Sequence, residues 1–103
     1  PNDGYVRLDF PGGWEGDASD KFTAAGRTEK ENSIFNYIKR LANFRLKSSA
    51  IKTGKFMQFL PLDGVYVYFR YDNNQTVMCI MNTNKEPKTI DLSRFQERMK
   101  DYT

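Results

Sequence analysis

The spacing of apolar residues changes along the chain, from a helical period to a strand period, at about position 48. In the first part, apolar side chains recur three and four residues apart, which predicts an amphipathic helix over about residues 29–46. Thr28 and Glu31 stand three residues apart just before this row and form a capping-box pattern, which fixes the predicted start of the helix. The apolar row consists of Ile34, Tyr37, Ile38, Leu41 and Phe44, with Phe35 adding a large apolar group on another side.

After Ser48 and Ser49 the apolar period becomes two, which predicts β-strands over residues 55–60, 65–71, 76–81 and 89–92. In the second strand, alternation places Val65, Val67 and Phe69 on one face and Tyr66, Tyr68 and Arg70 on the other. The Asp63-Gly64 dipeptide predicts a hairpin turn before it. A further helical turn is expected over 93–99. These three or four antiparallel strands would make half of a β-sandwich.

Residues 5–28 precede the helix and read as a strand-like start followed by a loop rich in glycine, aspartate and proline. A loop of this length is normally either functional or disordered, and its aromatic residues Phe10, Trp14 and Phe22 argue against plain disorder. Gly12 and Gly13 are expected to supply positive φ angles, and Arg27 is expected to hold the loop through carboxylates such as Asp17. A small free-standing domain rarely starts in this way, so we expect the chain to be a piece of a larger protein.

Composition sets the scale of the fold. The chain has 103 residues, of which 39% are hydrophobic and 15% aromatic, so there is room for one small domain with a modest core. No apolar run approaches the ~20 residues that a membrane span needs. Residues 1–4 have no signal-peptide features, which leaves the location of the protein open. The single Cys79 rules out an internal disulfide and is expected to be a buried thiol.

Charge raises the question of an anionic partner. Six basic residues and no acidic residue fall between positions 39 and 55, within a net charge of +3. One interpretation is a nucleic-acid surface, and the other is a group of solvated cations near a helix C-terminus. The sequence contains no helix-turn-helix, zinc or RNA-binding pattern, so we favour the second interpretation and predict no nucleic-acid partner.

The absence of histidine excludes several chemistries. A Ser-His or Cys-His nucleophile and an imidazole metal site are impossible within this chain. The sequence also lacks a phosphate-binding P-loop and a GxGxxG turn, so no cofactor is predicted. Only carboxylates remain for acid–base work.

Four segments together resemble a known family. RLDFPGGWEGD (7–17), FTAAGRTEKEN (22–32), LANFRLKSSAIKTGKF (41–56) and PLDGVYVYFRYDNNQTVMCIMN (61–82) resemble, in order and spacing, the C-terminal end of the α-amylase family, glycoside hydrolase family 13. The likeness is to its neopullulanase-like members from bacterial starch-utilisation systems. No single motif is diagnostic, but the resemblance covers nearly the whole chain.

The resemblance implies a fold and a location. Residues 1–48 would be the last loop and the last helix of a catalytic (β/α)8 barrel, and residues 49–103 an incomplete C-terminal β-sandwich. The fold class is therefore an α+β fragment with an antiparallel, mostly β C-terminal domain. A loop that follows a barrel strand lies on the active-site face. The family members in question act on starch, pullulan or maltodextrin, so the resemblance also implies a periplasmic or secreted protein.

The resemblance also implies that the catalytic groups lie elsewhere. Family members hydrolyse α-glucosidic bonds with retention, using carboxylates at the ends of the fourth, fifth and seventh barrel strands, none of which is in this chain. Retaining hydrolysis needs two rigidly held carboxyl groups about 5–5.5 Å apart. We therefore predict no catalytic residue and no hydrolase activity in this chain by itself. A Ca²⁺ ion is common in the family, but no ligand cluster here supports a metal site.

The partners implied are the α-glucan substrate of the parent enzyme and its own barrel. Trp14 is the first candidate for touching sugar, because an exposed indole can stack on a pyranose ring, although it could instead pack at the barrel rim. Arg7 and Asp9 could hydrogen-bond sugar hydroxyls or form a structural ion pair. The alternative function is a non-catalytic glycan-binding module that uses Trp14 or the sheet tyrosines Tyr66, Tyr68 and Tyr71. Packing is the competing explanation for those tyrosines.

Overall fold

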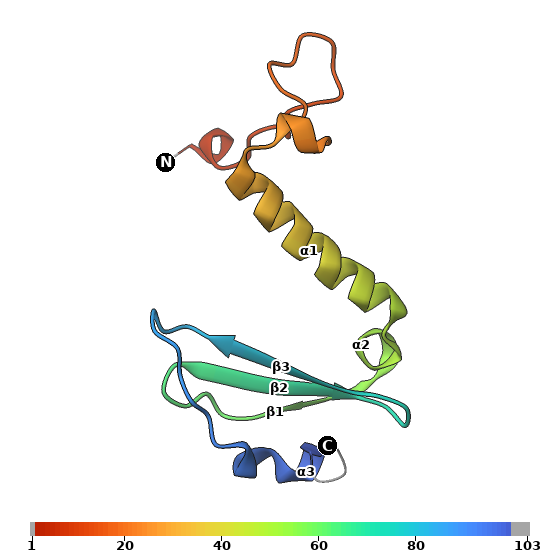
Figure 1. Cartoon of the computed structure of the whole chain (residues 1–103), viewed down its shortest axis with the longest axis vertical. Helices are drawn as coiled ribbons and strands as arrows, with labels where there is room; N and C mark the ends of the chain where they lie inside the picture. The colour runs from red at the N-terminus through yellow and green to blue at the C-terminus, as the bar shows by residue number, and fades with distance from the viewer. Residues whose placement is uncertain (1, 100–103) are drawn as a thin grey trace. The chain divides into compact units, whose positions relative to one another are not determined.

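The computed structural model describes residues 2–99, which form one long helix, one antiparallel sheet and several short helical segments (Figure 1). The chain divides into two compact units, Pro1–Asn43 and Phe44–Thr103, each described by itself. The helices are α1 (Glu29–Lys47), α2 (Ser49–Thr53) and α3 (Gln96–Met99), the 3₁₀ turns are η1 (Asp3–Tyr5), η2 (Ala24–Gly26) and η3 (Leu92–Phe95), and the strands are β1 (Lys55–Gln58), β2 (Val65–Tyr71) and β3 (Thr76–Asn82).

Helix α1 begins where the capping box predicts. The Thr28 N–H donates to Glu31 Oε2 (2.8 Å), and the Glu31 N–H donates to Thr28 Oγ1 (3.2 Å), so each residue satisfies a backbone donor that the first helical turn leaves free. The helix runs to Lys47, one residue beyond the predicted end, and carries Arg45 and Lys47 in its last turn. The prediction of this helix is confirmed. The strand-like start expected from Tyr5 is wrong, since η1 ends at Tyr5 and residues 6–10 form no strand.

The sheet has the order β1-β2-β3, with antiparallel neighbours throughout (Figure 1). Strand β2 has the predicted bounds, and its alternation is the predicted one: Val65, Val67 and Phe69 are 6%, 3% and 1% exposed. Strand β3 runs one residue past the predicted end, to Asn82. The predicted strand 55–60 is two residues too long, because β1 ends at Gln58 and the Leu60 carbonyl accepts from Arg94 instead of from a strand.

The hairpin turn between β1 and β2 has the predicted chemistry. Asp63 and Gly64 both have positive φ angles, +52° and +74°, as a type I′ turn requires. Leu62 and Val65 flank the turn and exchange two backbone hydrogen bonds of 3.1 and 3.0 Å. The turn is also tied to the end of β3, because Thr83 Oγ1 donates to the Gly64 carbonyl at 2.7 Å.

The fourth predicted strand, over residues 89–92, is wrong. Residues 89–91 carry no ladder pairing, and Leu92 already begins η3. The reason is local: Asp91 Oδ1 accepts from the Ser93 N–H at 2.9 Å, so Asp91 acts as the N-cap of a helical turn and ends any extended run. The helical turn expected over 93–99 is confirmed by η3 and α3.

The core lies between the sheet and this C-terminal helical segment. Phe95 is 1% exposed and packs with the buried valines and Phe69, while Ile90 and Met99 add partly buried apolar groups. Over residues 2–99 the covered face of the sheet therefore meets helical turns and not a second sheet. The structure supports an α+β domain with a three-stranded antiparallel sheet, which is coarser than the β-sandwich we expected.

Helix α2 was not predicted, although its signals stand in the sequence. Ser48 is its N-cap and accepts from the Ile51 N–H at 3.2 Å, and Gly54 is its C-cap. A Cβ on Gly54 would collide with the Ala50 and Tyr71 carbonyls, so only glycine lets this turn approach β2 so closely. The sequence predicts a domain boundary at Ser48 and Ser49. The two compact units divide inside α1, after Asn43, and the boundary at 48 stays a prediction.

Candidate functional site

The loop before α1 is organised around one carboxylate. Asp17 Oδ2 accepts from the Gly12 N–H at 2.8 Å and from the Trp14 N–H at 3.3 Å, which closes the loop over residues 12–17. Gly12 and Gly13 have φ angles of +122° and +93°, as the sequence predicted. Gly12 is buried, and a Cβ there would collide with the Asp20 side chain, so this position requires glycine for space as well as for conformation.

Trp14 projects from this closed loop with 82% of its surface exposed. Its backbone is held by Asp17, whereas Phe10 and Phe22 in the same loop pack edge to face, with ring centroids 4.9 Å apart. The indole therefore stands outside the small cluster that orders the loop. This geometry suits a contact with sugar and a contact with another protein surface equally well, so the role of Trp14 stays a prediction.

Arg7 and Asp9 lie on the exposed stretch before the loop. The ion pair of Arg7 is with Asp3, at 3.4 Å, and both side chains are more than three-quarters exposed. Such a pair contributes little to stability and fixes no geometry. Asp9 is exposed as well. The expected Arg7–Asp9 arrangement is therefore not what organises this segment, and a sugar contact by either residue remains a prediction.

Arg27 holds the loop in a different way from the one expected. Its guanidinium donates to the Lys21 carbonyl (2.8 Å) and to Asn32 Oδ1 (3.0 Å), and it stacks 3.7 Å from the ring centroid of Phe35. Asp17 is not among these contacts. Arg27 thus joins the loop to the first turns of α1, because its planar fork reaches both while its face covers an aromatic ring.

Lys21 adds an ion pair at the same junction. Its Nζ lies 2.7 Å from Glu31 Oε2, the carboxylate that also caps α1. The hydrogen bond from Lys21, followed by the one from the Thr28 N–H, lowers the pKa of Glu31 below its usual value. The loop and the helix N-terminus therefore share one set of polar contacts.

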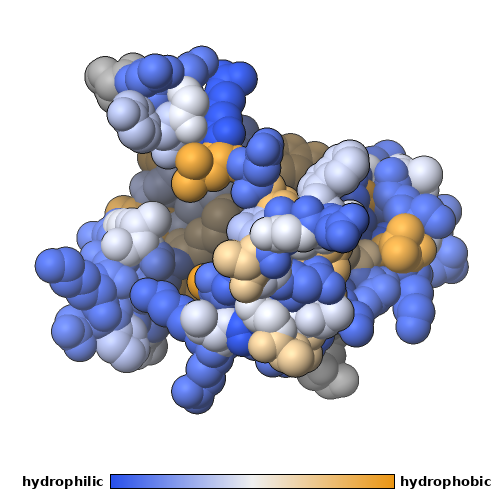
Figure 2. Space-filling view, turned by 90° about the horizontal axis from the view of Figure 1, so that it is seen from above, coloured by the Kyte–Doolittle hydropathy of each residue, from blue (hydrophilic) through white to orange (hydrophobic). Residues whose placement is uncertain are grey.

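Next to these polar contacts, α1 presents a large apolar surface. None of its residues is buried, and all of them lie in the described part of the chain. On the face seen in Figure 2, hydrophobic residues likewise reach the surface between hydrophilic ones. An open pocket of about 360 Å³ lies between loop and helix and is lined mainly by Phe10, Pro11, Ile34, Phe35 and Ile38. An apolar row of this size on a protein surface normally marks an interaction site.

The sheet tyrosines are divided between the two faces of the sheet. Tyr66 and Tyr68 lie on the face opposite the core, whereas Tyr71 lies on the core side, where the Arg98 guanidinium stacks 3.9 Å from its ring. The expected row of three tyrosines is therefore wrong for Tyr71, because the period of two separates an odd position from two even ones. Packing on the core side therefore accounts for the aromatic side chain at Tyr71.

Phe56 takes the third place in the row. The register pairs Phe56 with Arg70 and Gln58 with Tyr68, so both β1 residues share the face of Tyr66 and Tyr68. Ring centroids are 5.4 Å apart for Phe56 and Tyr68 and 5.7 Å apart for Tyr66 and Tyr68. The sequence analysis missed Phe56, because its face depends on the pairing register, which a short strand does not reveal.

The two hydroxyls of this row have different partners. Tyr66 Oη donates to Gln58 Oε1 at 2.7 Å on the exposed side. Tyr68 is half-buried, and its hydrogen bond with Cys79, with burial as a smaller cause, raises the pKa of the Tyr68 hydroxyl. Cys79 is itself half-buried, on the same face as Tyr68, and not in the core as expected. The exposed polar group of the row is therefore the Tyr66–Gln58 pair.

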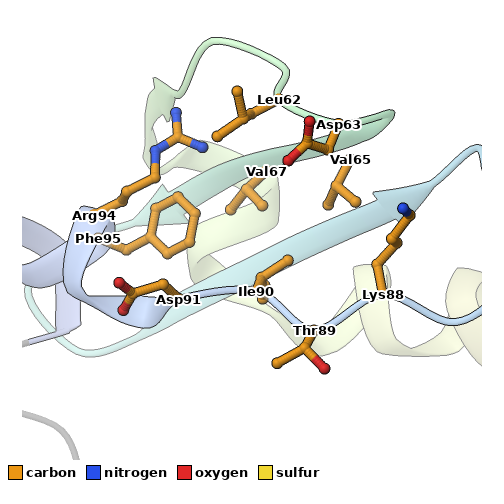
Figure 3. Close-up of a pocket in the computed structure, with 10 residues that line it drawn as sticks. All are labelled: Leu62, Asp63, Val65, Val67, Lys88, Thr89, Ile90, Asp91, Arg94 and Phe95. Atoms are coloured by element: carbon orange, nitrogen blue, oxygen red, sulfur yellow. The ribbon is translucent and has the colours of Figure 1, made fainter.

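The core side of the sheet contains a pocket of about 250 Å³ (Figure 3). Figure 3 shows Leu62 and Asp63 on the turn at one side, and Thr89 and Ile90 on the extended segment at the other. Its floor is apolar, and Phe95 is too deeply buried to offer a ring face. Two of its charged groups already have partners within the chain, since Asp91 caps η3 and Arg94 donates to the Leu60 carbonyl. The pocket therefore does not combine a ring face with free polar groups, as a sugar site would.

Two general features bear on the class of site. Among residues 2–99 there is no group of three or more Cys, Asp or Glu side chains placed to hold a metal ion. In the same part of the chain, no helix is long and apolar enough to cross a membrane.

Comparison with known families adds an assignment for the second unit. Residues 56–103 match the family model of the cyclo-malto-dextrinase C-terminal domain. This region contains β1 apart from its first residue, together with β2, β3, η3 and α3, so the match spans nearly all of the sheet and the segment that closes its core. The match supports an α-amylase family C-terminal domain over these residues.

Proposed function

We propose that the chain is the C-terminal portion of an α-glucan hydrolase, in which it stabilises the catalytic barrel and supplies one loop at the active-site rim. The observation that carries the proposal is the match of residues 56–103 to the cyclo-malto-dextrinase C-terminal domain, a non-catalytic domain of enzymes that act on α-glucans. Starch, pullulan or maltodextrin is the proposed substrate class of the intact enzyme, and the periplasm or the exterior its proposed location.

The exposure of the apolar side chains of α1 supports the proposal that residues 1–48 cover the barrel. The five side chains of the apolar row of α1 and that of Phe35 are between 39% and 58% exposed, and Leu46 is 70% exposed, which is unusual for a helix with an apolar row at helical spacing. Burying a side chain of this kind stabilises a protein by about 1.5–3 kcal/mol. The row therefore favours a partner surface of similar apolar character, and the outer side of a barrel provides one. The residues are Ile34, Phe35, Tyr37, Ile38, Leu41 and Phe44.

The loop before α1 supports a rim position. Its backbone is fixed by Asp17 and by Arg27, yet Trp14 remains exposed. A fixed loop that holds an aromatic side chain out of its own cluster suits contact with substrate, since binding residues are commonly carried on loops of a rigid scaffold. In this proposal Trp14 stacks on a sugar ring, and Arg7 and Asp9 lie within reach of its hydroxyls.

The chain itself has no catalytic role in this proposal. Among residues 2–99, the acidic residues other than the half-buried Asp72 are exposed. A retaining mechanism needs two carboxyl groups at a fixed separation of about 5–5.5 Å. The purified chain is expected to release no reducing sugar from pullulan or starch. Release of reducing sugar, at a rate proportional to the amount of chain, would show that the catalytic groups are here after all.

The mass of the native protein tests the proposal most directly. An antibody raised against this chain is used to immunoblot the source cells, separated into periplasmic, secreted and cytoplasmic fractions. Because a (β/α)8 barrel needs about 250 residues, the proposal expects a band several times larger than 12.0 kDa, outside the cytoplasm. A band at 12.0 kDa would contradict the proposal of a larger enzyme.

A further inference from the structure

The sheet face opposite the core carries a continuous row of three aromatic rings. Phe56, Tyr68 and Tyr66 follow one another at centroid distances of 5.4 and 5.7 Å, with interplanar angles of 41° and 37°. Phe56 is 53% exposed, while Tyr66 and Tyr68 are half-buried. The rings come from two strands paired in a fixed register, so the row is part of the sheet itself and not of a loop.

The row includes a polar pair beside its outermost tyrosine. Tyr66 Oη donates to Gln58 Oε1 at 2.7 Å, which orients both groups. After this bond, the Gln58 amide still has two N–H donors and the Tyr66 oxygen still has an acceptor site. Donors and an acceptor side by side, next to the half-buried ring of Tyr66, can bind neighbouring hydroxyls of one ligand.

The charge of this sheet face indicates which class of ligand it can bind. The face consists of Phe56, Gln58, Tyr66, Tyr68, Cys79 and Met81, none of which is charged, together with Val77 and Arg70 at one end. Arg70 Nη2 donates to the Gly54 carbonyl at 3.1 Å and is therefore engaged within the chain. A nucleic acid needs cations along its backbone in addition to rings for its bases. The face instead matches a neutral ligand.

We propose that the aromatic face binds a neutral glucan chain, with sugar rings on Phe56 and Tyr66 and hydroxyls on the Tyr66–Gln58 pair. The C–H groups on a pyranose face carry a small positive charge and are attracted to the negative face of an aromatic ring. The ring row supplies stacking, the polar pair supplies orientation, and both are fixed by the sheet. The choice of an α-glucan as the probe rests on the proposed function, whereas the neutral, polyhydroxyl character of the ligand follows from the face alone.

Electrophoresis of the whole 103-residue chain in native gels, with and without amylopectin, tests this proposal. We expect amylopectin to retard the wild-type chain. Phe56→Ala and Tyr66→Ala should reduce the retardation at least fivefold, and Tyr66→Phe, which keeps the ring and loses the hydroxyl, should reduce it by about twofold, as expected for one neutral hydrogen bond. Retardation should be unchanged by about 0.5 M NaCl, because the ligand is neutral.

Two exposed aromatic residues outside the face are the matched controls. Tyr37, on α1, is 57% exposed, and Tyr5, in η1, is 79% exposed, so Tyr37→Ala and Tyr5→Ala remove comparable surface and should leave retardation unchanged. Circular dichroism of each variant confirms that it is folded. Failure of the wild type to be retarded would overturn the proposal, and so would retardation that depends on Trp14 and not on Phe56.

These outcomes are separate from the test of the proposed function. The size of the native protein on an immunoblot does not depend on whether the isolated chain binds amylopectin. A large native protein with no retardation overturns only the glucan site. A band at 12.0 kDa with retardation overturns only the larger enzyme.

Discussion

The Ser48 hydroxyl donates to Gln75 Oε1 at 2.6 Å, joining the N-cap of α2 to the turn between β2 and β3. Ser48 is 2% exposed and also accepts from the Ile51 N–H, so one hydroxyl serves as both donor and acceptor. Gln75 Oε1 lies within 3.4 Å of the Ala50 N–H as well. Residues far apart in the sequence are thereby fixed together at the edge of the second unit.

Ser48→Ala should therefore destabilise the second unit. The substitution removes an N-cap and leaves Gln75 without its closest partner, and each loss costs about 1 kcal/mol, so the expected decrease in the free energy of unfolding is about 2 kcal/mol. Urea denaturation followed by circular dichroism measures it. Ser33→Ala, on the exposed surface of α1, is the control and should change stability by less than about 0.5 kcal/mol. Equal stabilities of the two variants would show that the Ser48 contacts contribute nothing.

Phe95→Ala should remove the centre of the core. Phe95 is 1% exposed and packs edge to face against Phe59, with centroids 4.8 Å apart, while its ring also approaches Phe69. Removing a buried phenylalanine costs about 3–5 kcal/mol, a large part of the stability of a small domain. Thermal unfolding compares this variant with Leu60→Ala, whose side chain is 81% exposed. If both variants melt with the wild type, η3 does not close the core.

The sequence predicted the elements whose signals are local. The capping box at Thr28 and Glu31 set the start of α1, and Asp63-Gly64 set the hairpin, because in both cases neighbouring residues satisfy the requirement by themselves. The alternation of buried and exposed positions in β2 is also the predicted one, since burial on one face imposes a period of two.

The predictions from sequence are wrong where a tertiary contact determines the local structure or the partner of a side chain. Residues 89–91 have a strand-like composition, but Ile90 packs on the core without a ladder partner, and Asp91 turns the chain into η3. Arg27 contacts the Lys21 carbonyl and the Phe35 ring, whereas the sequence predicted a contact with the carboxylate of Asp17. Phe56 joined the aromatic row through the register of β1. None of these partners is adjacent in the sequence. The sequence therefore predicted Tyr66 and Tyr68 of the aromatic face but not Phe56.

The stability of α1 should depend on the ionisation of Glu31. The folded state lowers the pKa of Glu31 through the Lys21 and Thr28 hydrogen bonds, so the stabilising contribution is present above the unfolded pKa of about 4.3. It is lost as the pH falls through the lower, folded pKa. Helix content, measured by circular dichroism from neutral pH to about pH 2, should therefore fall in acid by more in the wild type than in Glu31→Gln.

The control for this titration is Glu29→Gln, which removes a carboxylate from the same turn but not from the capping box. It should keep the acid-dependent loss of helix seen in the wild type. A Glu31→Gln chain that loses as much helix in acid as the wild type would mean that other carboxylates control α1.

The apolar row of α1 should make the isolated chain self-associate. Ile38 and Leu41 are 58% and 53% exposed and lie next to four more large apolar side chains. Exposed apolar surfaces of this kind tend to associate with one another when their natural partner is absent. Sedimentation equilibrium should show the mean mass of the wild-type chain rising with concentration. The double variant Ile38→Glu with Leu41→Lys should stay monomeric, because burying either charge in an apolar interface is costly. Arg40→Glu changes a charge outside the row and should associate like the wild type. A wild-type chain that remains monomeric at all concentrations would argue that the row needs no partner, and would weaken the case that α1 covers a barrel.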